Sequence, residues 1–104
     1  MSVPDIFTPL GSEVLDNTDL TFAGGLDDIP DEAEYAHIQM NGGDVRYLDG
    51  VDAREKLTID ITDGTLLIDG KDIWYAATLS RLRFIRAADA AAQKLIVRYY
   101  KEGL

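Results

Sequence analysis

Glycine-containing turns recur at short intervals from residue 42 to residue 70, and they constrain the fold of this chain more than any other feature. Asn-Gly-Gly occupies residues 41–43, and Asp-Gly pairs follow at 49–50, 63–64 and 69–70. The runs between them are short and rich in Val, Ile, Leu, Thr and Tyr. Short β-forming runs divided by such turns are typical of sandwiches and barrels. The sequence therefore predicts an all-β fold, an antiparallel β-sandwich or a jelly-roll-like barrel.

Alternation of apolar and polar residues identifies the expected strands. In residues 35–40 and again in 57–62, apolar side chains take every second position, as in a strand with one buried face. Because Asn-Gly-Gly favours a tight turn, residues 35–40 and 44–47 are expected to pair as a hairpin. The alanine-rich stretch 87–93 is too short for a stable helix and is expected to be a loop. Further strands are expected around Leu20 and Phe22 and at residues 65–68, 73–76, 79–86 and 95–100.

The N-terminal residues 1–17 lack a sustained period, and Pro4, Pro9 and Gly11 interrupt them. We expect them to form an extended arm, leaving residues 18–104 as a single β-sandwich domain. In one interpretation the arm docks apolar side chains on a neighbouring subunit, and in the other it is a terminal strand or coil packed on its own domain. The side chains expected to bind a partner are Ile6, Phe7, Leu10, Val14 and Leu15.

The charge balance limits the possible partners. The chain has 19 Asp and Glu against 10 Lys and Arg, a net charge of −9, and no cysteine. Such a field repels polyphosphate and anionic lipid, so nucleic acid and membrane surfaces are not expected partners. The acidic residues of 27–34 lack the ligand spacing and glycine of a calcium loop, and a solvated loop is expected there.

Basic residues concentrate near the C-terminus. The last two expected strands contain four arginines, Arg81, Arg83, Arg86 and Arg98. Two of these, Arg81 and Arg83, are expected to share one strand face. They would either form ion pairs along the sheet or present a basic stripe to the acidic loop 27–34 of an adjacent copy.

The sequence contains no recognisable set of catalytic residues. The only histidine is His37, in the middle of an expected strand, and no serine lies in a nucleophile elbow. We expect neither an enzyme nor a cofactor or metal site. The aromatic residues Trp74, Tyr75, Tyr99 and Tyr100 are candidates for the core, a subunit interface or a sugar-stacking platform.

The chain contains Val-Arg-Tyr followed by a glycine turn, then Gly-x-Leu-Leu, Leu-Arg-Phe-Ile and a closing apolar strand. This order of strand and turn segments resembles that of small β-sandwich virion proteins of tailed bacteriophages. A Val-Asp-Ala-Arg segment at 51–54 departs from it, since the related proteins often have a Thr- and Pro-rich segment there. The matching segments are residues 36–39, 44–47, 49–50, 64–67, 79–85 and 95–100.

This resemblance implies a capsid decoration or cement subunit and no catalytic residues. The expected partners are the major capsid protein and copies of the chain itself, in a homo-oligomer such as a trimer. The subunit would be made in the host cytoplasm and would lie on the outer surface of the capsid, because its negative charge opposes contact with packaged DNA. A neck or tail accessory protein and a carbohydrate-binding module are the alternatives.

Overall fold

The computed structural model describes residues 7–21, 24–48, 64–76, 78–87 and 93–103, and these fold as antiparallel β-structure. One sheet has four strands in the order β1-β7-β2-β5, and the other has three in the order β4-β3-β6. The all-β expectation is confirmed. The strands are β1 (Phe7–Asp16), β2 (Tyr35–Asn41), β3 (Val45–Leu48), β4 (Thr65–Leu67), β5 (Asp72–Tyr75), β6 (Arg83–Arg86) and β7 (Lys94–Glu102).

The helical content of the described residues is two short 3-10 turns, η1 (Asp19–Thr21) and η2 (Leu79–Arg81). Neither is long and apolar enough to cross a membrane, and the same holds for every helix in the part of the chain that the structure describes. Leu20, expected in a strand, lies in η1 and is buried, while Phe22 and the alternating run 57–62 lie outside the described residues.

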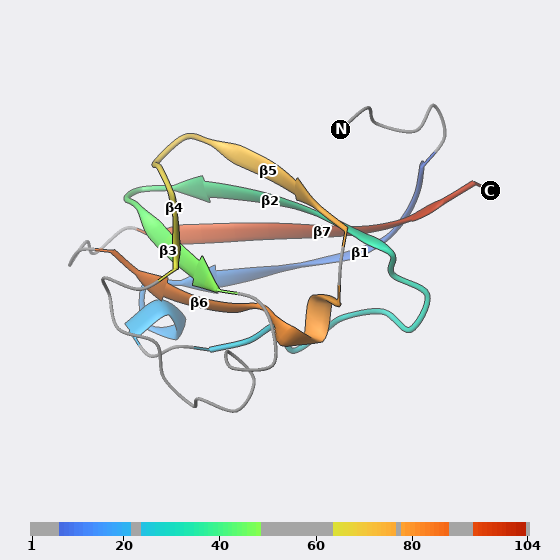
Figure 1. Ribbon diagram of the computed structural model, residues 1–104, viewed down its shortest axis with the longest axis horizontal. Coiled ribbons are helices and arrows are strands. Elements are labelled where there is room, and N and C mark those ends of the chain that lie inside the picture. The colour runs from blue at the N-terminus through green and yellow to red at the C-terminus, as the bar shows by residue number, and fades with distance from the viewer. Residues whose placement is uncertain (1–6, 22–23, 49–63, 77, 88–92, 104) are drawn as a thin grey trace.

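The core contains side chains of both sheets, and the three-stranded sheet lies against the left-hand part of the four-stranded one in Figure 1. Ala36, Ile38 and Met40 of β2 are fully buried, as the alternation predicted. Leu95 and Val97 of β7 lie beside them, and Val45, Leu67 and Phe84 of the other sheet complete the same cluster. Each fully buried aliphatic side chain of this kind contributes about 1.5 to 3 kcal/mol.

The predicted hairpin between β2 and β3 is wrong, because β2 pairs with β5 and β7 whereas β3 pairs with β4 and β6. The Asn-Gly-Gly turn carries the chain from one sheet to the other. Beside it, the turn at residues 68–71 returns the chain to the four-stranded sheet. Aspartates join the two crossings: the Gly42 N–H donates to Asp69 Oδ1 at 2.8 Å, and the Asp69 N–H donates to Asp44 Oδ1 at 2.8 Å.

Residues 7–16 do not extend away from the domain as the predicted arm. They form β1, which pairs with β7 from Phe7↔Glu102 to Asp16↔Lys94, so the alternative of a terminal strand packed on its own domain applies to them. Residues 1–6 lie outside the described part of the chain. The register shifts between Pro9 and Gly11, and this bulge changes which side of the sheet each later residue of β1 faces.

A buried carboxylate fixes β1 in place. Glu13 points to the inner side of the sheet and accepts hydrogen bonds from the Tyr99 hydroxyl at 2.7 Å and from the backbone N–H groups of Asp27 at 3.1 Å and Asp28 at 2.8 Å. The acidic loop is thereby tied to the sheet through its backbone, and the side chains of Asp27 and Asp28 are exposed. Glu13 thus joins the edge strand, the central strand β7 and this loop.

We expect Tyr99 to make stability sensitive to alkaline pH. Burial, and then the hydrogen bond and negative charge of Glu13, raise the pKa of Tyr99 above its ordinary value of 10.0. Because folding favours the neutral phenol, the stabilisation is complete below about pH 10 and is lost as the pH rises above that value. Urea denaturation between about pH 8 and pH 11 should show a steeper loss of stability in the native chain than in Tyr99→Phe. Equal slopes would contradict this assignment.

Candidate functional site: an aromatic platform on the outer face

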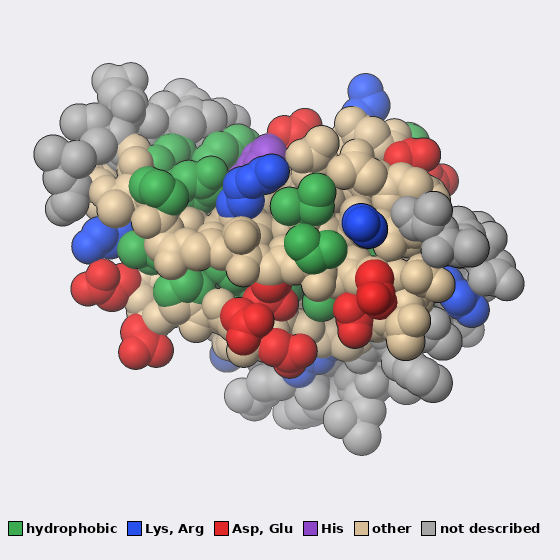
Figure 2. Space-filling view, turned by 180° about the vertical axis from the view of Figure 1, so that it is seen from behind, with side chains coloured by type: hydrophobic (Ala, Val, Ile, Leu, Met, Phe, Trp, Pro, Cys, Tyr) green, Lys and Arg blue, Asp and Glu red, His purple; other side chains and the backbone are tan. Residues whose placement is uncertain are grey.

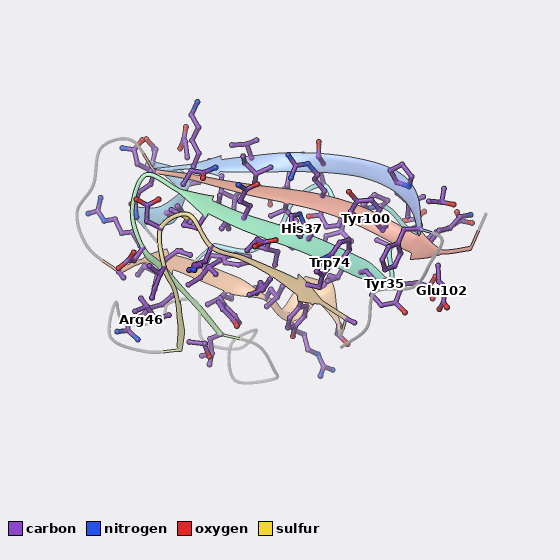
Figure 3. The ribbon with its side chains drawn as sticks, turned by 90° about the horizontal axis from the view of Figure 1, so that it is seen from above. Tyr35, His37, Arg46, Trp74, Tyr100 and Glu102 are labelled. Carbon is purple, nitrogen blue, oxygen red and sulfur yellow. The ribbon has the colours of Figure 1, made fainter. Side chains whose placement is uncertain are left out.

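The outer face of the four-stranded sheet presents aromatic side chains to solvent. On β2 the residues that alternate with the buried Ala36, Ile38 and Met40 include Tyr35 and His37. Register pairing places Tyr100 of β7 opposite Tyr35, and Trp74 of β5 opposite His37. In Figure 3 these four labelled side chains lie together over β2 and its neighbours, whereas Arg46 lies at the other end of the molecule.

We call this group, with Phe7, the aromatic platform. The Trp74 ring lies 4.9 Å from the His37 ring and 5.3 Å from the Tyr100 ring, measured between centroids. Phe7 contacts Tyr35 edge-on at 5.1 Å and Tyr100 at 5.6 Å. These separations lie within the range at which aromatic pairs attract each other, so the rings hold one another in fixed positions.

Phe7 connects the two edges of the sheet through its contact with Trp74. It belongs to β1, one edge of the sheet, yet it stacks on Trp74 of β5, the opposite edge, at 5.0 Å with an interplanar angle of 10°. One face of the Trp74 ring is therefore already covered. All five side chains are half-buried, and Figure 2 shows apolar side chains gathered beside the single histidine on this face.

Polar groups border the platform. His37 Nε2 lies 2.6 Å from Asp72 Oδ2, and the Tyr35 hydroxyl donates a long hydrogen bond of 3.4 Å to Glu102 Oε2. Desolvation and the neighbouring Glu102 carboxylate raise the pKa of Tyr35 above its usual range. Arg98 of β7 lies opposite His37 on the same outer face. The platform thus combines apolar rings with hydrogen-bonding groups at its border.

Aromatic rings and hydrogen-bonding groups are the chemical features of this site. Over the described residues no pocket is present, and no three His, Cys, Asp or Glu side chains lie where they could hold a metal ion together. Clustered Trp, Tyr and Phe side chains on an open surface are the residues that dominate binding energy at protein interfaces. The arrangement can bind a complementary surface through ring contacts and hydrogen bonds.

The apolar residues of the N-terminal segment that were predicted to bind a partner lie in different parts of the structure. Phe7 joins the platform, and Val14 lies on the same outer face with 53% of its surface exposed. Leu15 is buried in the core of its own domain and Leu10 packs partly against that core, so neither presents its side chain to a neighbour. Ile6 lies outside the described residues.

Arg81 and Arg83 do not form the expected stripe on one strand face. Arg81 ends the 3-10 turn η2, and Arg83 begins β6. The Arg83 guanidinium donates to the backbone carbonyls of Ser80 at 3.0 Å and Leu82 at 2.9 Å, which secures the turn that leads into the strand. The turn at residues 79–81 interrupts the strand predicted for residues 79–86.

Strand alternation separates the aromatic residues that the sequence analysis grouped together. Trp74 and Tyr100 face outward, whereas Tyr99 is fully buried and Tyr75 packs against the core. Sequence reasoning missed Tyr35 as a member of the site, and it named Phe7 as a partner-binding residue of an N-terminal arm, apart from these rings. The position of Tyr35, one residue before the buried Ala36 in an alternating run, was a usable signal, but Phe7 could be located only through the pairing of β1 with β7.

Comparison with protein-family models, curated proteins and solved structures finds no match to this chain.

Proposed function

We propose that this chain is a structural binding subunit with a β-sandwich fold, and that it attaches to a larger protein assembly through the aromatic platform. We further propose that the assembly is a bacteriophage virion, in which the chain is a decoration or cement subunit on the outer face of the major capsid protein lattice. Attachment through the platform replaces attachment through an N-terminal arm, since Phe7 belongs to the sheet.

The observation that carries this proposal is the set of interlocked aromatic rings on an outer sheet face. Half-buried Trp, Tyr and Phe side chains retain apolar area that a partner can cover, and their mutual contacts reduce the entropy lost when they are fixed by binding. The virion setting is supported by the order of strand and turn segments. The net charge of −9 favours the exterior of a particle that contains DNA.

The number of copies in an assembly tests the decoration role directly. Particles should be purified from the native source of the chain by sedimentation, and the chain counted by quantitative mass spectrometry against the major shell protein. A ratio of one to one, or one to a small integer, is expected for decoration. A handful of copies would instead favour the alternative of a neck or tail accessory protein, since closed rings contain few subunits. Absence from the particles would overturn the virion proposal.

Replacing Trp74 with alanine should remove the chain from these particles. Loss of a central aromatic contact commonly costs 2 kcal/mol or more, so attachment should weaken by about 30-fold or more. The matched control is Leu66→Ala on the other sheet, where an apolar side chain is 40% exposed but lies outside the platform. Equal occupancy of the two variants, both folded by circular dichroism, would contradict attachment through the platform.

A carbohydrate-binding module is the second candidate, and the observation that favours it is the position of the His37 and Asp72 pair beside Trp74. Sugar sites combine an aromatic ring with hydrogen-bonding groups at its border. The stacked Phe7 ring weighs against it, because it covers one face of Trp74. Binding to a broad glycan array that is lost in Trp74→Ala would support this candidate, and no binding across the array would weigh against it.

A further inference from the structure

Arg98 lies on β7, on the same outer face of the four-stranded sheet as the platform. It alternates along β7 with the buried Val97 and Tyr99, so its side chain projects outward. Ser12 of β1 is its register partner on one side and His37 of β2 on the other. The half-buried Arg98 therefore lies at the border of the platform, in the same register row as His37 and Trp74.

No group in the described part of the chain binds the Arg98 guanidinium, although this chain is rich in carboxylates. The nearby carboxylate of Asp72 is already paired with His37, and Glu102 accepts from Tyr35. Two other cations do have partners within the chain: Arg83 donates to two backbone carbonyls, and Lys101 pairs with Glu32 at 3.2 Å. The hydrogen-bond donors of Arg98 are therefore available to a partner.

Docking on the platform would remove water from Arg98. A buried charge without a partner is strongly unfavourable, so a surface that covers this residue needs to supply hydrogen-bond acceptors, and a carboxylate forms the strongest hydrogen bonds with a guanidinium. The guanidinium presents parallel N–H donors that match the two oxygens of a carboxylate. The platform rings next to it favour an apolar group beside that carboxylate.

We propose that Arg98 anchors an Asp or Glu side chain of the protein partner, and that an apolar side chain of the same partner segment packs on the platform. This inference rests on the proposed function, since it specifies the partner of the same surface. Arg98 and Tyr100 are two residues apart along β7, which corresponds to about 7 Å. Alternate side chains of an extended segment have the same spacing. The partner motif is therefore an acidic residue and an apolar residue separated by one position.

Selection from a random peptide library on the immobilised full-length chain tests this inference. Enriched peptides should contain an Asp or Glu two positions from a Leu, Ile, Phe or Trp. Fluorescence of Trp74, the only tryptophan in the chain, reports binding at the platform directly. Changing the selected acid to its amide in a synthetic peptide should weaken binding to the native chain at least tenfold.

The variant Arg98→Gln should bind the acidic peptide and its amide equally well, because it lacks the charge that distinguishes them. Lys94→Gln is the matched control, since it removes one positive charge from the same strand and outer face but lies two rows from Arg98, opposite Asn41. This control should keep the preference for the acid. Thermal denaturation should show that both variants remain folded.

The other outcomes separate this inference from the proposed function. Apolar peptides without an acid that bind in a Trp74-dependent manner would overturn the role of Arg98 and leave the platform supported. An acid preference that is equally strong in Arg98→Gln would also overturn it. Failure to enrich any peptide would overturn the peptide motif, and binding of a uronic-acid glycan that requires Arg98 would overturn the protein partner as well.

Discussion

Replacing Glu13 with alanine is expected to lower the free energy of unfolding by about 3 to 4 kcal/mol, because a buried donor that loses its acceptor costs about 1 to 3 kcal/mol. Three donors lose their acceptor in this variant: the Tyr99 hydroxyl and the N–H groups of Asp27 and Asp28. Water can reach the loop side of the site, which is why the total is below the sum of three full penalties. Urea denaturation followed by circular dichroism measures the change.

Glu32→Ala is the matched control for this prediction. Glu32 is exposed and pairs with Lys101 at 3.2 Å, and surface ion pairs of this kind contribute about 1 kcal/mol or less. Glu13→Gln should lie between the two, since an amide keeps one acceptor oxygen. If Glu13→Ala destabilised the chain no more than Glu32→Ala, Glu13 would not be the joint between β1, β7 and the loop.

Alanine at Gly64 is expected to destabilise the fold by about 3 kcal/mol or more, through strain and steric overlap together. Gly64 has a φ of +82°, and a Cβ there would lie 2.4 Å from the carbonyl oxygen of Tyr47. That oxygen belongs to backbone, which cannot move aside without separating β3 from β4. Thermal denaturation of the variant should show a markedly lower midpoint.

Gly70→Ala separates the two causes. Gly70 has nearly the same φ, +83°, but a Cβ there would meet nothing within 4 Å. Only the cost of the left-handed backbone conformation applies, about 1 to 2 kcal/mol. Equal losses in the two variants would show that the β3–β4 contact yields easily to an added methyl group.

Local sequence was sufficient to assign the two faces of β2. Ala36, Ile38 and Met40 alternate with polar or aromatic neighbours, and a strand with one buried face is the simplest structure that fits this pattern. The pairing of strands was not predictable in the same way. Asn-Gly-Gly permits a tight reversal, but β3 pairs with β4 and β6, and Asp69, which accepts from the Gly42 N–H at this turn, lies far along the chain.

The candidate site was only partly predictable for the same reason. Trp74 and Tyr100 were recognised as possible binding aromatics and Phe7 as a partner-binding residue of an arm, but the bulge between Pro9 and Gly11 hid that Phe7 shares a face with them. Phe7, Glu13 and Leu15 are all odd-numbered, so an unbroken strand would place them on one face. The bulge sends Phe7 to the outer platform and leaves Glu13 and Leu15 on the inner side, and this shift also explains why no period was visible.

The sequence of β1 also limits aggregation through this edge of the sheet. An edge strand of ten residues offers a row of backbone groups to which a strand of another molecule could add, as happens in amyloid growth. Three features oppose such growth: Pro9 lacks a donor, the bulge disrupts the row, and Glu13 turns a charge inward. The β1 edge of the sheet is therefore protected against addition of a foreign strand, even when molecules are brought close together.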